Sequence, residues 1–367
     1  MKVFYLYTNN RNGGFGVLGK GIQRMFENSK FFDLVGSGLK EIPKSEPDLI
    51  FTYGTPDLFD EVRELREERD WNNFKHVHYF VWESSKIPSE FVMKFHDADL
   101  LITAAEYTRK AARYAGLKNT KVWHHAVDDR FQYIDKDFEN GTFVFLHHNG
   151  YEYRKGTEFV LEAFTKEFNL DEDVKLIIKA RERKLSIWLT PKISPYTPEQ
   201  LELKRRDVRE FREKYLSIDH PQIEEIIGHV SDEEMVSINE MAHCFVFPAK
   251  GEGWGLPPFE CLAMGIVPIM PKYSCFSEWF DERFMLGIKE AGYTNTEPRY
   301  TGYMFHPSVK QIRKQMRWAF EHRKELKEMG KKGSKHIHEN YNWDKVHNEL
   351  VDIIKNYKWP RKKRMKY

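Results

Sequence analysis

The segment FPAKGEGWGLPPFECLAMGIVPI, residues 247–269, decides the fold. It begins as an apolar strand that ends at Pro248, continues as a loop containing three glycines, and becomes a helix near Pro257. Proline suits the first turn of a helix, because the N–H group that it lacks has no intrahelical partner there. Glycines before a helix allow a ligand to approach the backbone closely. The segment therefore predicts an anion site, suited to a diphosphate, at the carboxyl edge of a parallel sheet.

Short apolar stretches alternate with longer amphipathic stretches on both sides of this segment, a pattern typical of βα units around parallel sheets. The pattern predicts strands at residues 2–8, 31–35, 48–53, 76–82, 99–103, 121–126, 142–147, 174–180, 223–228, 244–248 and 266–270. It predicts helices at 16–27, 57–71, 156–168, 232–241 and 257–264. Residues 128–141 are polar and rich in turn formers, and we interpret them as a linker. We expect two Rossmann-like α/β domains, at residues 1–130 and 142–340.

Length and composition agree with a protein of this class. The chain has 367 residues, enough for about two or three domains, and 41% of them are apolar, which excludes a mainly disordered chain. No apolar run approaches the ~18 residues of a membrane helix, and residues 1–10 indicate a first strand, not a secretion signal. Three cysteines without metal-type spacing predict neither disulfides nor a zinc site. We expect a cytoplasmic protein.

Charge is distributed unevenly along the chain. Residues 355–367 contain seven basic residues and no acidic one, whereas the rest of the chain is mildly acidic. Such a tail can contact anionic lipid head groups or nucleic acid, or it is only a solvated terminus. Residues 181–219 form a charged insertion longer than a normal βα loop, with an exposed helix expected at 198–216. This helix either binds a partner or is simply solvated.

Glu252 and Glu260, with seven residues between them in EGWGLPPFECLAMGIVP, carry a family resemblance. Together with the surrounding glycines they resemble the signature of retaining nucleotide-sugar glycosyltransferases of family four, also called glycosyl transferases group 1. These enzymes have the GT-B fold, in which two Rossmann-like domains face each other. Further matching segments are Arg154-Lys155-Gly156 at the donor diphosphate, 229–235 beside the nucleotide base, 125–131 at the domain junction, 82–88 near the acceptor, and 341–346 at the start of the last helix. In this fold that helix crosses back onto the first domain, so we expect residues 341–367 to form a crossover helix and the basic tail.

The resemblance implies transfer of a sugar from a UDP- or GDP-linked donor to an acceptor hydroxyl, with retention at the anomeric carbon and without a metal. Lys155 would neutralise the departing diphosphate, and Glu252 would position the donor sugar or shield positive charge at its anomeric carbon. Glu83 would contact the acceptor hydroxyl, unless it is only a solvated residue at a strand end. We expect Glu260 to bind the ribose hydroxyls.

Other positions of the resemblance concern donor binding alone. Many members carry an arginine where this chain has Asn149, so Lys179 or Arg181 would supply the second cation of the phosphate clamp. The glycine-rich loop after the first strand, with Gly14 and Phe15, would lie near the donor phosphates. The remaining donor-binding residues that we predict are Gly253, Trp254, Gly255 and Leu256. Trp254 is equally well interpreted as a packing residue.

Two patterns that imitate metal sites are rejected. His76 and His78 share a strand face and His124 and His125 are adjacent, but no third ligand has suitable spacing, so we expect buried or half-buried histidines. Residues 171–173, Asp-Glu-Asp, imitate the metal-binding motif of the other main glycosyltransferase fold, and we predict a turn there. We expect no metal and no cofactor besides the nucleotide sugar.

The sequence leaves the acceptor open. One class is a glycan or a lipid-linked saccharide, with the tail holding the enzyme peripherally on an anionic membrane. A second is a hydroxylated base of DNA, as in phage DNA-modifying transferases, with the tail and the insertion following the phosphates. A third hypothesis is a non-catalytic sugar-nucleotide binding protein that keeps the fold, since a fold alone does not prove an activity.

Overall fold

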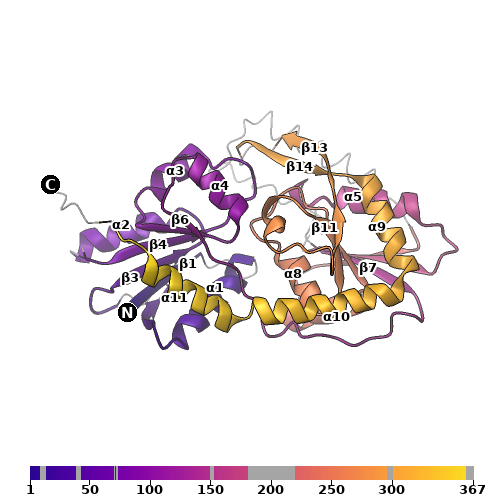
Figure 1. Ribbon diagram of the computed structural model, residues 1–367, viewed down its shortest axis with the longest axis horizontal. Coiled ribbons are helices and arrows are strands. Elements are labelled where there is room, and N and C mark those ends of the chain that lie inside the picture. Colours follow the sequence, from indigo (N-terminus) through magenta and orange to yellow (C-terminus); the bar gives the residue numbers. More distant parts are fainter. Residues whose placement is uncertain are drawn as a thin grey trace. The chain divides into compact units, whose positions relative to one another are not determined.

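The structure is a computed structural model that describes residues 1–8, 14–38, 43–69, 71, 73–148, 153–180, 220–295 and 301–360. The predicted insertion at 181–219, residues 361–367 of the basic tail, and the predicted site residues Asn149 and Arg181 lie outside the described residues. The chain forms two compact units (Figure 1). The first contains Met1–Trp82, Lys86–Ala126 and the chain from Tyr341, and the second contains Glu83–Ser85 and Val127–Asn340. The expected linker at 128–141 thus belongs to the second unit.

The first unit is built on a six-stranded parallel sheet in the order β2-β1-β3-β4-β5-β6. Its strands are β1 (Lys2–Tyr7), β2 (Asp33–Ser37), β3 (Leu49–Tyr53), β4 (Lys75–Phe80), β5 (Leu100–Thr103) and β6 (Thr120–Val122). Its helices are α1 (Gly14–Glu27), α2 (Leu58–Arg69), α3 (Ser89–Phe95), α4 (Glu106–Tyr114) and α11 (Trp343–Asn356). Every residue of β3 is buried, as expected for an inner strand of a parallel sheet covered on both faces.

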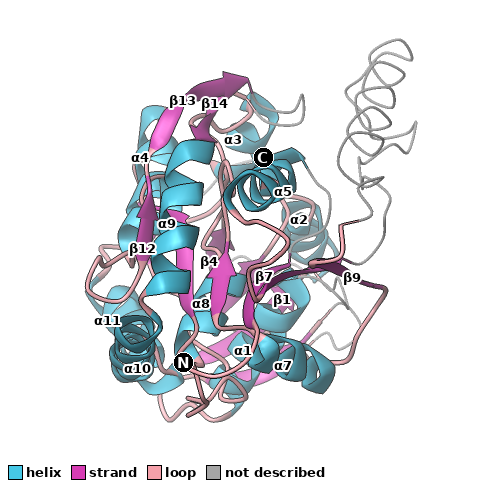
Figure 2. Cartoon of the chain, turned by 90° about the vertical axis from the view of Figure 1, so that its right-hand side faces the viewer, coloured by secondary structure: helices cyan, strands magenta, loops and turns pink. Residues whose placement is uncertain are grey.

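The second unit repeats this design with a six-stranded parallel sheet in the order β12-β11-β10-β7-β8-β9. Its strands are β7 (Phe143–His148), β8 (Val174–Ala180), β9 (Ile223–Ile227), β10 (Cys244–Val246), β11 (Val267–Pro271) and β12 (Leu286–Ile288). Its helices include α5 (Thr157–Glu167), α7 (Asp232–Met241), α8 (Leu256–Ala263), α9 (Val309–Glu321) and α10 (Arg323–Asn340). A separate antiparallel hairpin, β13 (Glu290–Asn295) and β14 (Tyr303–Pro307), stands apart from the six-stranded sheet (Figure 2).

The predicted return of the chain to its first unit is confirmed by α11. The indole Nε1 of Trp123 donates to the carbonyl of Val346 over 2.7 Å, and the ring of Trp343 lies against Gly21 of α1. Both contacts lie inside the first unit, whereas α10, the preceding helix, packs on α8 of the second unit. The chain therefore has the GT-B topology that the sequence predicted.

Most predicted elements are present within one or two residues of their predicted bounds. The second strand, expected at 31–35, lies at Asp33–Ser37, and the strand expected at 121–126 is only Thr120–Val122. The predictions gave no bounds for α3 and α4, which lie between predicted strands, and they missed α9, α10, β12 and the hairpin. In α9 the buried residues Ile312, Met316 and Ala319 recur at helical spacing, which is the signal that would have found it.

Close packing of α10 on α8 requires glycine at position 330. A Cβ atom built on Gly330 would clash with the carbonyl of Gly265, which is backbone and cannot rotate away. Nearby, the Ser334 hydroxyl donates to the carbonyl of Ala263 over 2.5 Å and fixes the register of the two elements. Small residues thus let the backbones of α10 and of the end of α8 meet.

We expect Gly330→Ala to destabilise the second unit. The clash lowers the free energy of unfolding by about 1–3 kcal/mol. This loss outweighs the roughly 1 kcal/mol that alanine gains as a better helix former than glycine. Thermal unfolding measures the effect, at about 2–4 °C in Tm per kcal/mol for a unit of this size. Lys332→Ala on the exposed side of α10 is the control and should change stability by less than about 0.5 kcal/mol. Equal Tm values for the two variants would contradict the packing argument.

No helix in the described part of the chain is long and apolar enough to cross a membrane.

Candidate functional site

The loop between β10 and α8 has a backbone that only glycine suits at its end. Gly255, the N-cap of α8, has φ 89°, in the left-handed region, and a Cβ atom there would also press on the ring of Phe276. The helix begins at Leu256, one residue before the predicted start, so Pro257 and Pro258 occupy its second and third positions. Because prolines carry no N–H group, Leu256 is the one residue among these three that has a backbone donor. An anion would therefore be bound by the amides of the loop and of Leu256.

Glu252 of this loop is held by two cations. Its Oε1 atom lies 2.5 Å from a guanidinium nitrogen of Arg154 and 2.7 Å from Nζ of Lys155. Both cations come from the short 3₁₀ helix Tyr153–Lys155, which precedes α5. The four positions before it, 149–152, lie outside the described residues. Arg154 also donates to the carbonyl of Gly251 over 2.8 Å and accepts at its own carbonyl from the N–H of Lys250. The two loops are thus tied together by charge and by backbone hydrogen bonds.

The electrostatics of this group favour an anionic ligand. Burial alone would raise the pKa of Glu252, but the charges of Arg154 and Lys155 outweigh it and hold the pKa below its usual value. The carboxylate is therefore ionised at neutral pH, and the three side chains together carry one net positive charge. All three are largely buried. Two cations against one carboxylate suit the approach of an anion.

Gly156 completes the Arg-Lys-Gly segment for a steric reason. Its φ is 72°, and a Cβ atom there would clash with the carbonyl of Pro248 in the neighbouring loop. Next to it, the fully buried Lys250 donates to Glu158 of α5 over 2.6 Å and lies over the ring of Phe159. The sequence analysis did not single out Lys250 or the role of Arg154. The adjacency of Arg154 to Lys155 in the quoted motif was the available signal for the arginine.

Glu83 is grouped with the second unit, which corrects its predicted assignment to the first domain. The reason is its backbone: the Glu83 carbonyl lies against Gly251, where a Cβ atom would clash with it. Burial raises the pKa of the Cys275 thiol well above its usual range, and the carboxylates of Glu252 and Glu83 raise it further. Both acids therefore lie close to the same thiol. The structure brings Glu83, Glu252 and Lys155, the three predicted catalytic residues, into one region.

Glu260 lies on α8 in a separate, acidic environment. Burial, followed by the charge of Asp128, raises its pKa to about 8, although the guanidinium of Arg130 acts in the opposite direction. Arg130 forms ion pairs with Asp128 and with Asp232, the first residue of α7. The described residues offer no hydrogen bond to the carboxyl group of Glu260. The segments at 125–131 and 229–235 therefore meet beside Glu260.

Lys179 is one of the two residues predicted to supply the second cation of the phosphate clamp. It is buried at the end of β8, and its Nζ donates to the carbonyls of Gly228 and Ala180, at 2.5 and 3.2 Å. Lys179 still lies near Lys155, because the charges of both lysines act on His148. Burial chiefly, and these charges in part, lower the pKa of His148 to about 3. The second cation beside Glu252 is Arg154, and the assignment of Lys179 to the phosphate clamp stays a prediction.

Trp254 is a packing residue. Its buried indole lies against the rings of Phe259 and Trp279, and its carbonyl accepts from Nε1 of Trp279 over 3.1 Å. Gly253 continues the buried loop between Glu252 and this indole.

Gly14 and Phe15 are the first residues of α1, in the first unit. Neither Gly14 nor Phe15 therefore belongs to the second unit.

The rejected metal patterns have structural roles. His76 and His78 are buried and both contact the hydroxyl of Thr52, and burial lowers the pKa of each. Residues 171–173 form the predicted turn, in which Glu172 pairs with Arg317 of α9. Within the described ranges, no three His, Cys, Asp or Glu side chains are grouped so that they could hold a metal ion.

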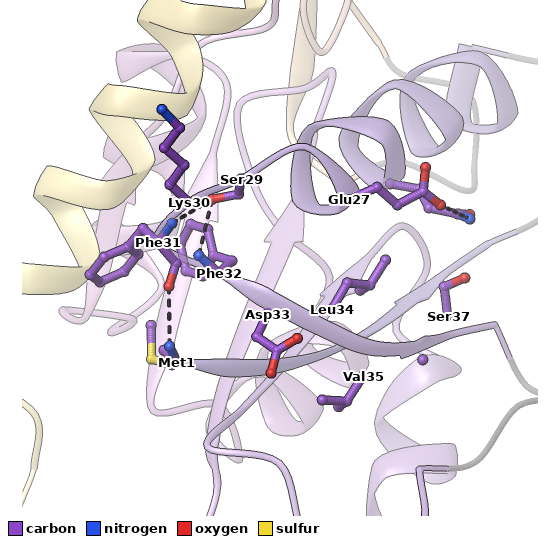
Figure 3. Close-up of a pocket in the computed structure, with 12 residues that line it drawn as sticks. Met1, Glu27, Ser29, Lys30, Phe31, Phe32, Asp33, Leu34, Val35 and Ser37 are labelled. Carbon is purple, nitrogen blue, oxygen red and sulfur yellow. Dashed lines mark hydrogen bonds between the residues drawn. The ribbon is translucent and has the colours of Figure 1, made fainter.

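A concavity of about 700 Å³ lies elsewhere, in the first unit (Figure 3). It is lined by the end of α1, by the edge strand β2 and by the turn between them, where the Ser29 hydroxyl accepts from the N–H groups of Phe31 and Phe32. None of the predicted site residues lines it.

Two Rossmann-like sheets, a last helix that returns to the first of them, and a loop in which two cations hold a buried acid are features expected of a GT-B glycosyltransferase. Residues 129–336 match the family model of the glycosyl transferases group 1, and the chain belongs to this family. The predictions of family, fold and transferase class are thereby confirmed.

Solved structures share the fold at low sequence identity. Sucrose-phosphate synthase from Thermosynechococcus elongatus is 12% identical with a TM-score of 0.66, and the match covers 97% of this chain and 98% of that one. Anabaena HepE in complex with UDP and glucose is 11% identical with a TM-score of 0.65, over 97% and 100% of the two chains. A UDP-forming α,α-trehalose-phosphate synthase from Burkholderia xenovorans is 11% identical with a TM-score of 0.58, over 84% and 74%. A comparison of the sequence with curated proteins gave no match.

Proposed function

We propose that this glycosyltransferase moves a sugar from a UDP- or GDP-linked donor to the hydroxyl of a glycan or lipid-linked saccharide, with retention and without a metal. The observation that carries the proposal is the buried ionised Glu252 between Arg154 and Lys155, a group with one net positive charge beside a glycine-rich loop. A donor diphosphate is the anion that matches this charge. UDP is the first nucleotide to test, since the HepE structures contain UDP with glucose and UDP-glucose.

In the proposed reaction the acceptor oxygen forms its bond to the anomeric carbon on the face from which the diphosphate departs. The bond between that carbon and the phosphate oxygen breaks, and this oxygen takes the proton of the acceptor hydroxyl. Arg154 and Lys155 neutralise the charge that develops on the leaving diphosphate, the part that divalent metals play in other transferases. Glu252 stabilises positive charge at the anomeric carbon, and Glu83 orients the acceptor hydroxyl. No protein nucleophile is needed.

Thermal unfolding in the presence of UDP, GDP, ADP and their sugars tests the donor site. A ligand at 100 times its Kd stabilises the protein by about 2.7 kcal/mol, which is easily measured. We expect a shift with one nucleotide, lost in Glu260→Ala because the ribose contact is removed. Absence of a shift with every nucleotide would contradict the proposed function.

The raised pKa of Glu260 predicts that nucleotide affinity depends on pH. Ribose hydroxyls donate to the carboxylate form, so binding should expel the proton that the acid holds below pH 8. If only the ionised form binds, affinity rises about 50-fold from pH 6 to pH 8 and then levels off. Calorimetry in buffers of different ionisation enthalpy measures the released proton.

Glu260→Gln is the control, because it removes the ionisation and keeps the side-chain shape. Its affinity should change with pH only as much as the ionisation of the nucleotide phosphate itself requires. In the free protein the stability that protonated Glu260 provides is lost as the pH rises through 8. The Tm of the Gln variant should therefore fall less than that of the wild type between pH 6 and pH 8. If nucleotide affinity changed with pH equally in the two proteins, the assignment of Glu260 to the ribose would be contradicted.

A further inference from the structure

The hairpin β13–β14 exposes aromatic rings that the core does not use. Tyr293 is 64% exposed and Tyr303 is 45% exposed, and their ring centroids lie 4.7 Å apart in an edge-to-face arrangement. Beneath them, Phe305 contacts Tyr293 at 5.4 Å and stacks on the buried Tyr273 at 4.2 Å. The exposed pair is thus supported by rings that anchor it to the second unit. Exposed and rigidly supported aromatic side chains are typical of binding surfaces.

The hairpin is joined to the candidate site from two directions. On one side, the N–H of Ser85 donates to the carbonyl of Tyr303 over 3.1 Å, and the Ser85 hydroxyl accepts from the N–H of Tyr303 over 2.9 Å. The Ser84 hydroxyl, in the residue after Glu83, donates to the carbonyl of Thr301 over 2.9 Å. On the other side, the N–H of Phe305 donates to the carbonyl of Lys250, two residues before Glu252. The exposed rings are therefore fixed relative to both acids.

We propose that Tyr293 and Tyr303 form a platform on which a sugar ring of the acceptor stacks, so that the acceptor is a neutral carbohydrate. This inference rests on the proposed function and names the substrate class of the same site. A pyranose has a face of C–H groups that packs on the electron-rich face of an aromatic ring, while its hydroxyls stay in water. Tyrosine suits this contact, because its flat ring is amphipathic and has few rotatable bonds to immobilise.

Local charge favours a carbohydrate over a nucleic acid, whose bases would also stack on tyrosine. The two hairpin strands and the segment Glu83–Ser85 carry two carboxylates, Glu83 and Glu290, and the exposed lysines that flank these segments, Lys86 and Lys289, balance their charge. Glu290 lies at the base of the hairpin, where its charge, after burial, raises the pKa of Tyr273. A phosphate backbone led across this surface would meet no net positive charge from these residues, whereas a neutral sugar needs none.

Binding to an array of neutral glycans, with the best nucleotide present, tests the platform. We expect the wild-type protein to bind at least one neutral glycan, and Tyr293→Ala and Tyr303→Ala each to weaken this binding about tenfold, the equivalent of ~1.4 kcal/mol. Tyr293→Phe keeps the ring and should stay within about threefold of the wild type. Tyr114→Ala is the matched control, since Tyr114 is an exposed tyrosine of α4 in the first unit.

The nucleotide-induced thermal shift separates failure of this inference from failure of the proposed function. A normal shift with no bound glycan, or glycan binding that both alanine variants retain, would overturn the platform and leave the donor site intact. Binding of a single-stranded DNA oligonucleotide that the alanine variants lose would overturn the carbohydrate assignment in favour of a nucleic-acid acceptor. Loss of the shift in the wild type would instead count against the proposed function itself.

Discussion

Glu252→Ala is expected to slow sugar transfer severely and to destabilise the second unit. The substitution removes the Glu252 carboxylate from its largely buried ion pairs with Arg154 and Lys155, and loss of one partner of a buried ion pair costs about 3–5 kcal/mol. It also removes the carboxylate that we place at the anomeric carbon, a loss of roughly 100- to 1,000-fold in rate. Release of nucleoside diphosphate from the sugar nucleotide that gives the largest thermal shift measures the rate, and thermal unfolding measures the stability.

Glu252→Gln separates the two effects. The amide keeps the shape and an oxygen for Lys155, so the fold should survive better, while transfer should still fall about 100-fold because the charge is gone. Glu162→Ala is the control for loss of an ordinary acid: its partner Lys166 is exposed on α5, and such pairs contribute about 0–1 kcal/mol. A Gln variant that binds nucleotide and transfers sugar at the wild-type rate would remove Glu252 from the mechanism.

The sequence predicts best those features that depend on neighbours along the chain. The loop and helix at 247–269 were found because strand, glycines and prolines follow one another, and the bounds differ by only one residue at Leu256. The strand β8 was predicted with its observed range, Val174–Ala180, because it is mostly apolar and is bounded by Asp173 and Arg181. Residues near in sequence share one local structure, so composition alone is informative there.

Features that depend on distant parts of the chain were predicted less well. Arg154 pairs with Glu252 across nearly one hundred positions, and no local pattern shows that the arginine reaches that carboxylate. Glu83 was placed in the wrong unit because its backbone contact with Gly251 is a tertiary contact. The hairpin was missed because β13, Glu-Ala-Gly-Tyr-Thr-Asn, does not alternate apolar and polar residues and derives its strand structure from pairing with β14.

Lys155→Ala is expected to slow transfer more than it weakens binding of the whole nucleotide sugar. Lys155 stands 2.7 Å from Glu252 and shares it with Arg154, so its removal leaves a paired Glu252 and costs less stability than loss of the acid. Its charge matters most when the leaving diphosphate gains negative charge, which predicts a fall of about 100- to 1,000-fold in kcat with a smaller change in KM. Lys155→Arg should recover part of the rate, because it restores the charge with a different geometry.

Nucleosides and nucleotides together identify the group that Lys155 contacts. If it binds the diphosphate, Lys155→Ala should weaken binding of the nucleoside diphosphate and leave the corresponding nucleoside unaffected, whereas Glu260→Ala should weaken both. Lys166→Ala, which removes an exposed lysine from the last turn of α5, should change neither. A Lys155 variant that weakens the nucleoside and its diphosphate equally would place the lysine away from the phosphates, and the charge argument for the leaving group would then rest on Arg154 alone.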